Sequence, residues 1–262
     1  MSAPFYLITG STGIAAATAR RAVAAGARVH IASRSETNVS ALVDELRAAG
    51  GDVSGTAAEL TRRGDVERVV ADAVGRGGRI DAVYNVAGIS GRRFGDGPVH
   101  VCTDDGWDTV MDANVKSMFL VCRAALNQML DQPRDAHGIR GTVLNMASVL
   151  GLHPQRDHFD THAYAASKGA ILSLSRAMSA TYAPEGIRVN AIAPGLVRTP
   201  MSRRAQDDPA ILDHMRGKQP LAGGLIDAEE VAKLSLFLMD SAQSAMMTGD
   251  ILTIDAGWAV SA

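Results

Sequence analysis

Short apolar runs alternate along the chain with longer segments of helical periodicity. The runs are brief and rich in β-branched residues, which predicts strands. They lie at Phe5 to Thr9, Arg28 to Ala32, Asp52 to Ala57, Ala82 to Val86, Thr142 to Met146, Arg188 to Ile192 and Asp250 to Ile254. Segments 14–25 and 36–49 are rich in Ala, Leu, Arg and Glu and stop at glycine, which predicts helices.

This alternation of strand and helix predicts parallel strands joined by right-handed crossovers. The expected fold is a doubly wound, Rossmann-type α/β sheet of about seven parallel strands with helices on both faces. We expect one domain over residues 1–262. Segment 201–224 is longer and more polar than its neighbours, which fits either a lid over a site or a plain surface loop.

The composition is that of an ordinary globular protein, with 47% hydrophobic and 21% charged residues. A net charge of −2 offers no electrostatic case for nucleic acid or an anionic membrane as a partner. The first strand begins at about Phe5, which leaves no room for a leader segment, so we expect a cytoplasmic protein. Two cysteines suggest no disulfide framework, and no apolar run approaches the roughly 20 residues of a membrane span.

Glycines mark the turn from the first strand into the first helix, in the run TGSTGIAA at 9–16. A turn without Cβ atoms at Gly10 and Gly13 lets a pyrophosphate approach the backbone and the positive end of the helix. This signal is weak alone, because glycine-rich turns also occur as plain connections.

A tyrosine and a lysine stand at i and i+4 in the run YAASK, which places Tyr164 and Lys168 on one face of a helix. Free tyrosine is a poor base at neutral pH, and a nearby ammonium stabilises the phenolate and lowers the phenol pKa. Ser148 ends the strand in LNMAS, and Asn114 lies in the helical run DANVKSMFL. NVAG, which ends at Gly88, closes another strand.

Together these motifs resemble the short-chain dehydrogenase/reductase family, in its single-domain, NAD(P)-dependent branch. The family pattern of TGxxxGxG, NNAG, Asn, Ser, YxxxK, PG and TG…DGG appears here as TGSTGIAA, NVAG, Asn114, Ser148, YAASK, Pro194-Gly195 and TGDILTIDAG. The resemblance implies an oxidoreductase that interconverts a ketone or aldehyde and an alcohol by hydride transfer. It makes Tyr164 the acid/base and Lys168 its partner at the ribose, with Ser148 on the substrate oxygen and Asn114 supporting a water.

The resemblance also implies a set of cofactor contacts. They are Gly10, Ser11, Thr12, Gly13, Ile14, Ser33, Arg34, Glu59, Leu60, Asn85, Ala87, Gly88, Tyr164, Lys168, Pro194, Gly195, Val197 and Thr199. The glycine loop is one residue shorter than in the branch, and Ala15 or Ala16 replaces the third glycine. That glycine serves close packing of helix on strand, which alanine can also provide. Val86 stands where the family often has Asn.

The end of the second strand, Ala32-Ser33-Arg34, bears on the choice of nicotinamide. A carboxylate there would bind the ribose 2′-hydroxyl of NAD, whereas a 2′-phosphate needs a cation. With no acid at Ser33 and a guanidinium following, NADP(H) is favoured and NAD(H) stays possible. Against NADP(H), Thr12 stands where many NADP(H)-preferring relatives carry a basic residue. The alternative to a phosphate contact is that Arg34 merely stacks on adenine or lies in solvent.

Other function classes stay open. A catalytically silent dinucleotide sensor would be expected to lose Tyr164 and Lys168, which are present here. The spacing TGxxGxxA suggests a nucleotide-sugar epimerase-like enzyme, but the chain lacks that branch's additional length. His153, His158 and His162 show no strict ligand motif, so we expect them to line the pocket or lie at the surface, with no metal site.

The substrate and the assembly are expectations of the same kind. The stretches 90–99, 148–164 and 201–224 should form the substrate pocket, and their Arg, His and Asp residues favour a sugar, polyol or oxo-acid over a steroid. A thioester stays open, because the family includes 3-oxoacyl reductases. The resemblance implies a homo-oligomer, a tetramer, in which the helices of Asn114 and Tyr164 pair across two-fold axes and the C-terminus forms a second interface.

Overall fold

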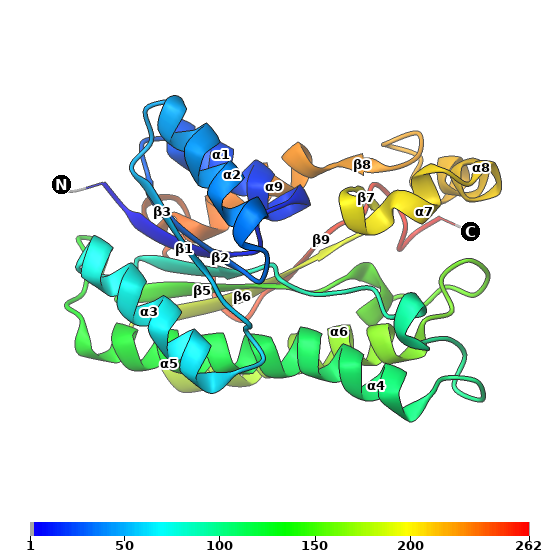
Figure 1. The fold of residues 1–262 in the computed structure, drawn as a ribbon, viewed down its shortest axis with the longest axis horizontal. Coiled ribbons are helices and arrows are strands. Elements are labelled where there is room, and N and C mark those ends of the chain that lie inside the picture. Colours follow the sequence, from blue (N-terminus) through cyan, green and yellow to red (C-terminus); the bar gives the residue numbers. More distant parts are fainter. Residues whose placement is uncertain (1–2, 262) are drawn as a thin grey trace.

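Seven parallel strands form the centre of the computed structural model, which describes residues 3–261 (Figure 1). The strands are β1 (Phe5–Thr9), β2 (Arg28–Ser33), β3 (Val53–Ala57), β4 (Ala82–Asn85), β5 (Gly141–Met146), β6 (Ile187–Pro194) and β9 (Ile251–Ile254). Their order in the sheet is β3-β2-β1-β4-β5-β6-β9. Every predicted run falls on one of these strands, with ends that differ by at most two residues, so the predicted doubly wound sheet is confirmed.

Helices cover both faces of the sheet. They are α1 (Gly13–Ala24), α2 (Glu36–Ala48), α3 (Arg63–Gly77), α4 (Asp104–Met111), α5 (Ser117–Asp131), α6 (His162–Tyr182), α7 (Arg203–Gln206), α8 (Pro209–Lys218), α9 (Ala228–Met239) and α10 (Ser241–Ser244). Figure 1 shows α1, α2 and α9 on one face, α3, α5 and α6 on the other, and α7 and α8 at one end. Within residues 3–261, no helix combines the length and the apolar character that crossing a membrane requires.

Alternate residues of each strand feed two separate apolar layers. In β1, Leu7 packs into the layer with α3, α5 and α6, whereas Ile8 packs into the layer with α1, α2 and α9. Both side chains are fully buried. Strands that are buried on both faces read as continuous apolar runs, which is why the sequence predicted them well.

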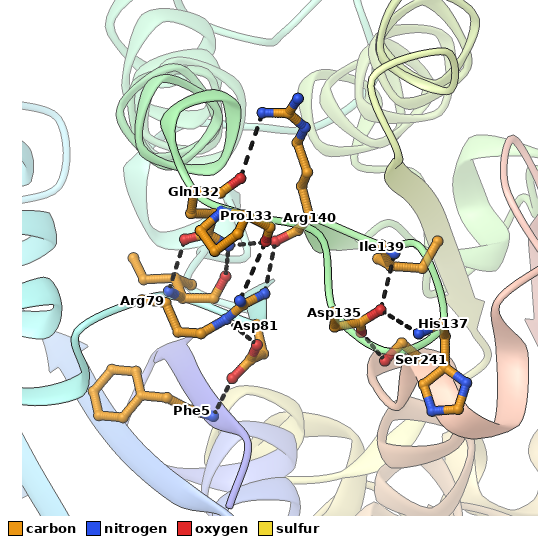
Figure 2. Close-up of polar contacts among 11 residues, drawn as sticks. Phe5, Arg79, Asp81, Gln132, Pro133, Asp135, His137, Ile139, Arg140 and Ser241 are labelled. Carbon is orange, nitrogen blue, oxygen red and sulfur yellow. Dashed lines mark hydrogen bonds and ion pairs between the residues drawn. The ribbon is translucent and has the colours of Figure 1, made fainter. Parts of the chain in front are cut away.

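Polar contacts fasten the amino edge of the sheet (Figure 2). The Asp81 carboxylate, just before β4, accepts the backbone N–H of Phe5 at 2.7 Å and the Arg79 Nε–H at 2.6 Å. Asp135, in the loop before β5, accepts the N–H of Ile139 at 2.9 Å and the hydroxyl of Ser241 in α10 at 2.6 Å. These two carboxylates tie the start of β1, the loop before β5 and α10 to one edge.

The opposite, carboxyl edge collects the loops after β1, β4, β5 and β6. Strand order reverses between β1 and β4, and ligands of doubly wound sheets bind in the crevice at such a point. The short 3₁₀ turns η1 (Arg92–Phe94), η3 (Val149–Gly151) and η4 (Pro200–Ser202) lie in these loops, and a π-helical turn, η2 (Asp112–Lys116), joins α4 to α5.

Segment 201–224 is mostly helical, since it contains α7 and α8. Two strands that the sequence did not predict, β7 (Val197–Arg198) and β8 (Ile226–Asp227), pair in parallel and bring the ends of this segment together. Ile211 and Met215 of α8 are fully buried in a small apolar cluster with Trp258. The segment thus presents polar residues to solvent while α8 packs its apolar residues inward.

Candidate active site

A cavity of about 280 Å³ opens at the carboxyl edge of the sheet. The loops after β1, β4, β5 and β6 line it together with α6, the start of segment 201–224 and Trp258. Many predicted site residues meet there: Gly10, Thr12, Gly13, Ile14, Ala87, Gly88, Ser148, Tyr164, Lys168, Pro194, Gly195, Val197 and Thr199. The motifs that are scattered through the sequence thus converge on one cavity.

The glycine loop has the features that bind a pyrophosphate. Gly10 and Gly13 adopt left-handed backbone angles, φ 103° and 55°, which other residues rarely adopt. Helix α1 has no acidic residue in its first turn, and the Thr12 side chain does not cap it. Its first N–H groups and the positive end of its dipole are therefore available to an anion beside the cavity. These residues fit a dinucleotide.

Ala15 and Ala16, either of which can take the place of the third glycine, are both buried, and Ala15 lies against the glycine loop. The Ala15 Cβ lies 3.0 Å from the position that a Cβ on Gly10 would occupy. Because Gly10 has no Cβ, the glycine loop can approach α1 closely even though α1 carries alanine at position 15.

Helix α6 carries Tyr164 and Lys168 on the face that lines the cavity, as predicted. Lys168 is 4% exposed; its Nζ donates to the carbonyl O of Met146 at 2.9 Å and lies 5.5 Å from the centre of the Tyr164 ring. Ser148 directly follows Ala147 at the end of β5, and its Oγ accepts the N–H of Leu150 at 3.2 Å. The lysine thereby links α6 to the end of β5.

A close backbone contact holds the turn after Ser148 against α6. A Cβ placed on Gly151 would lie 2.9 Å from the backbone N of Gly169 and 2.9 Å from the carbonyl carbon of Lys168. No side chain larger than hydrogen fits between η3 and the helix there. Gly151 therefore lets Ser148 lie beside Tyr164.

A buried aspartate holds the start of α6. The Asp96 carboxylate, in the connection from β4 to α4, accepts the N–H of Ala163 at 2.9 Å and the N–H of Tyr164 at 3.0 Å. Thr161, at the N-cap position of α6, makes no side-chain cap of its own. Asp96 thus fixes the backbone of Tyr164, although no motif singled it out.

Asn114 is fully buried in the π-helical turn and does not line the cavity. Its Oδ1 accepts the N–H of Ile89 at 2.7 Å, and its Nδ2 donates to the carbonyl O of Ile89 and to Ser167 Oγ, both at 3.1 Å. The amide joins the loop after β4 to α6 from behind the cavity. Its expected support of a water stays a prediction.

Burial dominates the ionisation of the two groups on α6. It raises the pKa of the Tyr164 phenol, and the Ser148 hydroxyl opposes this in part. Burial also lowers the pKa of the Lys168 ammonium to about 8. The sequence analysis expected the ammonium to lower the phenol pKa, whereas desolvation is the larger effect here. The phenol is therefore protonated at neutral pH.

The other predicted cofactor residues lie outside the cavity. The Oγ atoms of Ser11 and Ser33 are 2.7 Å apart, which joins the glycine loop to the end of β2. The Arg34 side chain is 73% exposed, and its guanidinium lies 4.0 Å from the Glu59 carboxylate. Ser33 and Arg34 therefore lie beside the glycine loop, outside the cavity.

Two further predicted contacts, Leu60 and Asn85, have buried side chains that serve the fold. Leu60 packs in the apolar layer with α3 and α5. Asn85 donates to Asn145 Oδ1 at 2.9 Å, between β4 and β5. Any contact of these two residues with a cofactor would therefore come from their backbone.

Several cavity residues were not among the predicted contacts. They are Ala15, Val86, Ile89, Ser90, Arg92, Met146, Ala147, Val149, Leu150, His158, Phe159, Thr161, Leu196, Pro200, Met201, Ser202, Arg204, Ala205 and Trp258. About half of them fall in the three stretches predicted to form the pocket. Trp258 does not, and no pattern near the C-terminus indicated that its 2% exposed ring would reach the site.

Only one of the three singled-out histidines lines the cavity. His158 does so, His153 is exposed, and His162 is exposed with its Nδ1 accepting the N–H of Val99 at 3.1 Å. Over residues 3–261, no group of three or more His, Cys, Asp or Glu side chains is arranged to hold a metal ion.

Comparison with known proteins relates this geometry to a family. A family model described as "Enoyl-(Acyl carrier protein) reductase" matches residues 8–259. An A-factor type gamma-butyrolactone 1'-reductase (1S-forming) of Streptomyces virginiae is 36% identical over 260 residues, which cover 97% of this chain and 95% of that protein. The 3-oxoacyl-(acyl-carrier-protein) reductase FabG of Thermotoga maritima is 32% identical and is covered to 96%, as is this chain.

Among solved structures, a variant of actinorhodin polyketide ketoreductase with NADPH superposes with a TM-score of 0.85 at 28% identity, covering 98% of each chain. The matches extend from the glycine loop to the C-terminal strand, over the same elements that build the cavity. The chain belongs to the short-chain dehydrogenase/reductase family, and it is an NAD(P)-dependent oxidoreductase acting on carbonyl and alcohol groups.

Proposed function

We propose that this protein is an NADP(H)-dependent carbonyl reductase, or alcohol dehydrogenase in the reverse direction, with Tyr164 as its acid/base. One observation carries the proposal. The phenol of Tyr164, the ammonium of Lys168 and the hydroxyl of Ser148 line the same cavity as the glycine loop. A carbonyl compound and the nicotinamide end of a dinucleotide can therefore meet in one cavity.

The side chains divide the work as follows. The nicotinamide, when bound, supplies or accepts the hydride. Ser148 donates a hydrogen bond to the substrate oxygen, and Tyr164 gives that oxygen a proton in reduction and takes it back in oxidation. Burial keeps the phenol protonated, as reduction requires. The Lys168 ammonium stabilises the phenolate that remains after the proton has left.

For the cofactor, we propose that residues 10–14 hold the pyrophosphate, and Ser33 and Arg34 the 2′-phosphate of NADP(H). The absence of an acid at position 33 and the exposed guanidinium of Arg34 support this choice. So does the NADPH in the related ketoreductase. NAD(H) is the alternative, because Glu59 lies 4.0 Å from the same guanidinium and competes for it.

For the assembly, we propose a single-domain cytoplasmic homotetramer in which segment 201–224 acts as a lid. Large apolar side chains on α4 and α5 support one interface, since Trp107 is 42% and Phe119 44% exposed. Leu221 and Val260, each 89% exposed near the C-terminus, support a second. Sedimentation equilibrium tests the assembly, and an active monomer would contradict it.

The test of the chemistry is Tyr164→Phe, which removes only the phenolic oxygen. With a carbonyl substrate found by a panel, turnover should fall roughly 10² to 10⁴-fold. Binding of NADPH, titrated by nicotinamide fluorescence, should persist. Tyr182→Phe at the other end of α6 is the matched control and should keep full activity. A folded Tyr164→Phe variant with wild-type turnover would place the chemistry on another residue.

A further inference from the structure

Two arginines from separate segments meet at the wall of the cavity. Arg92 comes from η1 after β4, and Arg204 comes from α7 in segment 201–224. Both donate from Nη2 to the same backbone carbonyl, that of His158, at 2.6 and 2.8 Å. All three residues line the cavity.

The loop that offers this carbonyl is held in an unusual conformation. Asp157 and His158 both adopt left-handed backbone angles, with φ of 52° and 45°. Such angles are uncommon for residues other than glycine, although aspartate and histidine adopt them more readily than most. In this conformation the His158 carbonyl faces the two guanidinium groups and accepts a hydrogen bond from each.

The charges at this point do not balance. Arg92 also donates to Asp160 Oδ1 at 2.8 Å, whereas within residues 3–261 no carboxylate lies within ion-pair distance of Arg204. Burial and then the positive charge of Arg92 lower the pKa of Arg204, and the more distant Asp208 and Asp160 act in the opposite direction. Two cations thus share one close carboxylate, in a place where a second anion would relieve their repulsion.

Apolar side chains also line this cavity. Val149, Leu150, Phe159 and Trp258 form the wall, and the rings of Phe159 and Trp258 meet edge to face with centroids 5.1 Å apart. This wall shields one side of the guanidinium groups from water and strengthens a charge-assisted hydrogen bond on that side, while the outer side of Arg204 is exposed to solvent. It suits the carbon skeleton of a small molecule rather than a sugar with hydroxyls at every position.

We propose that Arg92 and Arg204 bind a carboxylate of the substrate, so that the preferred substrates are oxo-acids with an apolar skeleton. The planar guanidinium matches a carboxylate through paired N–H donors. The inference rests on the proposed function, since it names the substrate class of the same site. It also selects the oxo-acid among the polar substrates that the sequence left open.

The kinetic test compares acids with their neutral esters. Acetoacetate, levulinate and oxocyclohexane carboxylate are each assayed with NADPH against the corresponding methyl ester. We expect kcat/KM to be about 10 to 100-fold higher for the acid of the best pair, as charge-assisted hydrogen bonds allow. Arg204→Gln should remove this preference by lowering the value for the acid alone, and Arg204→Lys should keep part of it.

Arg203→Gln is the matched control. Arg203 precedes Arg204 in α7. Both side chains are exposed, but only Arg204 lines the cavity. Its replacement should change neither substrate. Equal kcat/KM for acid and ester in the wild type, or equal losses for both in Arg204→Gln, would overturn the inference while leaving the reductase function intact.

A second measurement needs no turnover. Trp258 lines the cavity, and the other tryptophan, Trp107, is exposed, so a Trp107→Phe background reports on the cavity alone. Titration with levulinate and methyl levulinate in the presence of NADP⁺, which cannot reduce a ketone, should show tighter binding of the acid, and Arg204→Gln should abolish the difference. Selective binding of acids without reduction of any carbonyl compound would refute the proposed function and support the anion site. Equal binding of acid and ester would refute the anion site.

Discussion

Replacing Gly151 by alanine should damage the site through a single methyl group. The new Cβ would lie 2.9 Å from the backbone of α6 at Lys168 and Gly169, and 3.2 Å from Lys168 Cβ. Favourable carbon contacts lie at about 3.5 to 4.0 Å, so η3 and the helix must separate by about 0.5 to 1 Å. The atoms in the way belong mainly to the backbone of a helix, which cannot swing aside.

This displacement sets the expected size of the effect. Overpacking a closely packed contact typically costs about 1 to 3 kcal/mol of stability. Ser148 precedes Gly151 by three residues and Tyr164 lies on the helix that is pushed away, so the distance between the two groups should grow. A misplacement of about 1 Å at reacting groups costs about 10²-fold in rate. We expect kcat to fall by about 10 to 100-fold.

The facing glycine supplies the control. A Cβ on Gly169 would find its nearest neighbour, the carbonyl O of Gly151, at 3.9 Å, which is an ordinary contact. Gly169→Ala should therefore keep activity and gain about 0.5 to 1 kcal/mol, because alanine suits a helix interior better than glycine. Steady-state kinetics and urea denaturation of both variants provide the assay. Wild-type kcat and stability in Gly151→Ala would show that this contact does not position Ser148.

Three further predictions concern other parts of the molecule. Asp96→Asn should lower kcat about tenfold by freeing the backbone of Tyr164, with no additional loss when combined with Tyr164→Phe; losses that multiply would mean that Asp96 acts on the fold instead. His30 in β2 is 2% exposed, and burial lowers its pKa to about 4. The neutral imidazole therefore contributes its full stability above the unfolded pKa of about 6.5, and this contribution is lost as the pH falls toward 4. The free energy of unfolding should drop by up to about 3 kcal/mol over that window, and His30→Gln should flatten the drop in urea titrations unless other groups cause it. Arg34→Ala should raise the KM for NADPH roughly tens to hundreds of fold more than that for NADH, whereas an equal change for both cofactors would indicate stacking on the adenine.

The sheet could be predicted because most of its strands are apolar runs with a turn at each end, whereas β3, with the sequence VSGTA, carries a weaker signal. Leu7 and Ile8 both face a buried layer, which gives β1 an unbroken signal. The pair β7 and β8 escaped prediction, since two-residue strands carry no periodicity. The helices inside segment 201–224 were missed because most of its residues are charged or polar, and the few buried residues of α8 are too sparse to show a helical pattern.

In the site, the sequence could identify residues whose chemistry is carried by a motif, such as Tyr164 and Lys168. It could not identify Asp96, which acts on residues 67 and 68 positions away, or Trp258, which reaches the cavity from the end of the chain. Their roles arise from contacts between distant segments. The ionisation of Tyr164 was also misjudged, because the sequence shows which charges are near a group but not how far the fold removes water from it.

The fastening of the amino edge of the sheet has an evolutionary consequence. The bonds made by Asp81 and Asp135 involve Phe5, Arg79, Ile139 and Ser241, and none of these belongs to the loops that line the cavity. These bonds therefore do not depend on the loops that shape the reaction at the carboxyl edge, where other bonds, such as that of Asn85 with Asn145, also join the strands. We therefore expect changes in the loops at the carboxyl edge to alter the choice of substrate with little effect on the bonds at the amino edge. Within this fold, the residues of the amino edge are constrained by stability, whereas the loops of the carboxyl edge are constrained mainly by the reaction and the substrate.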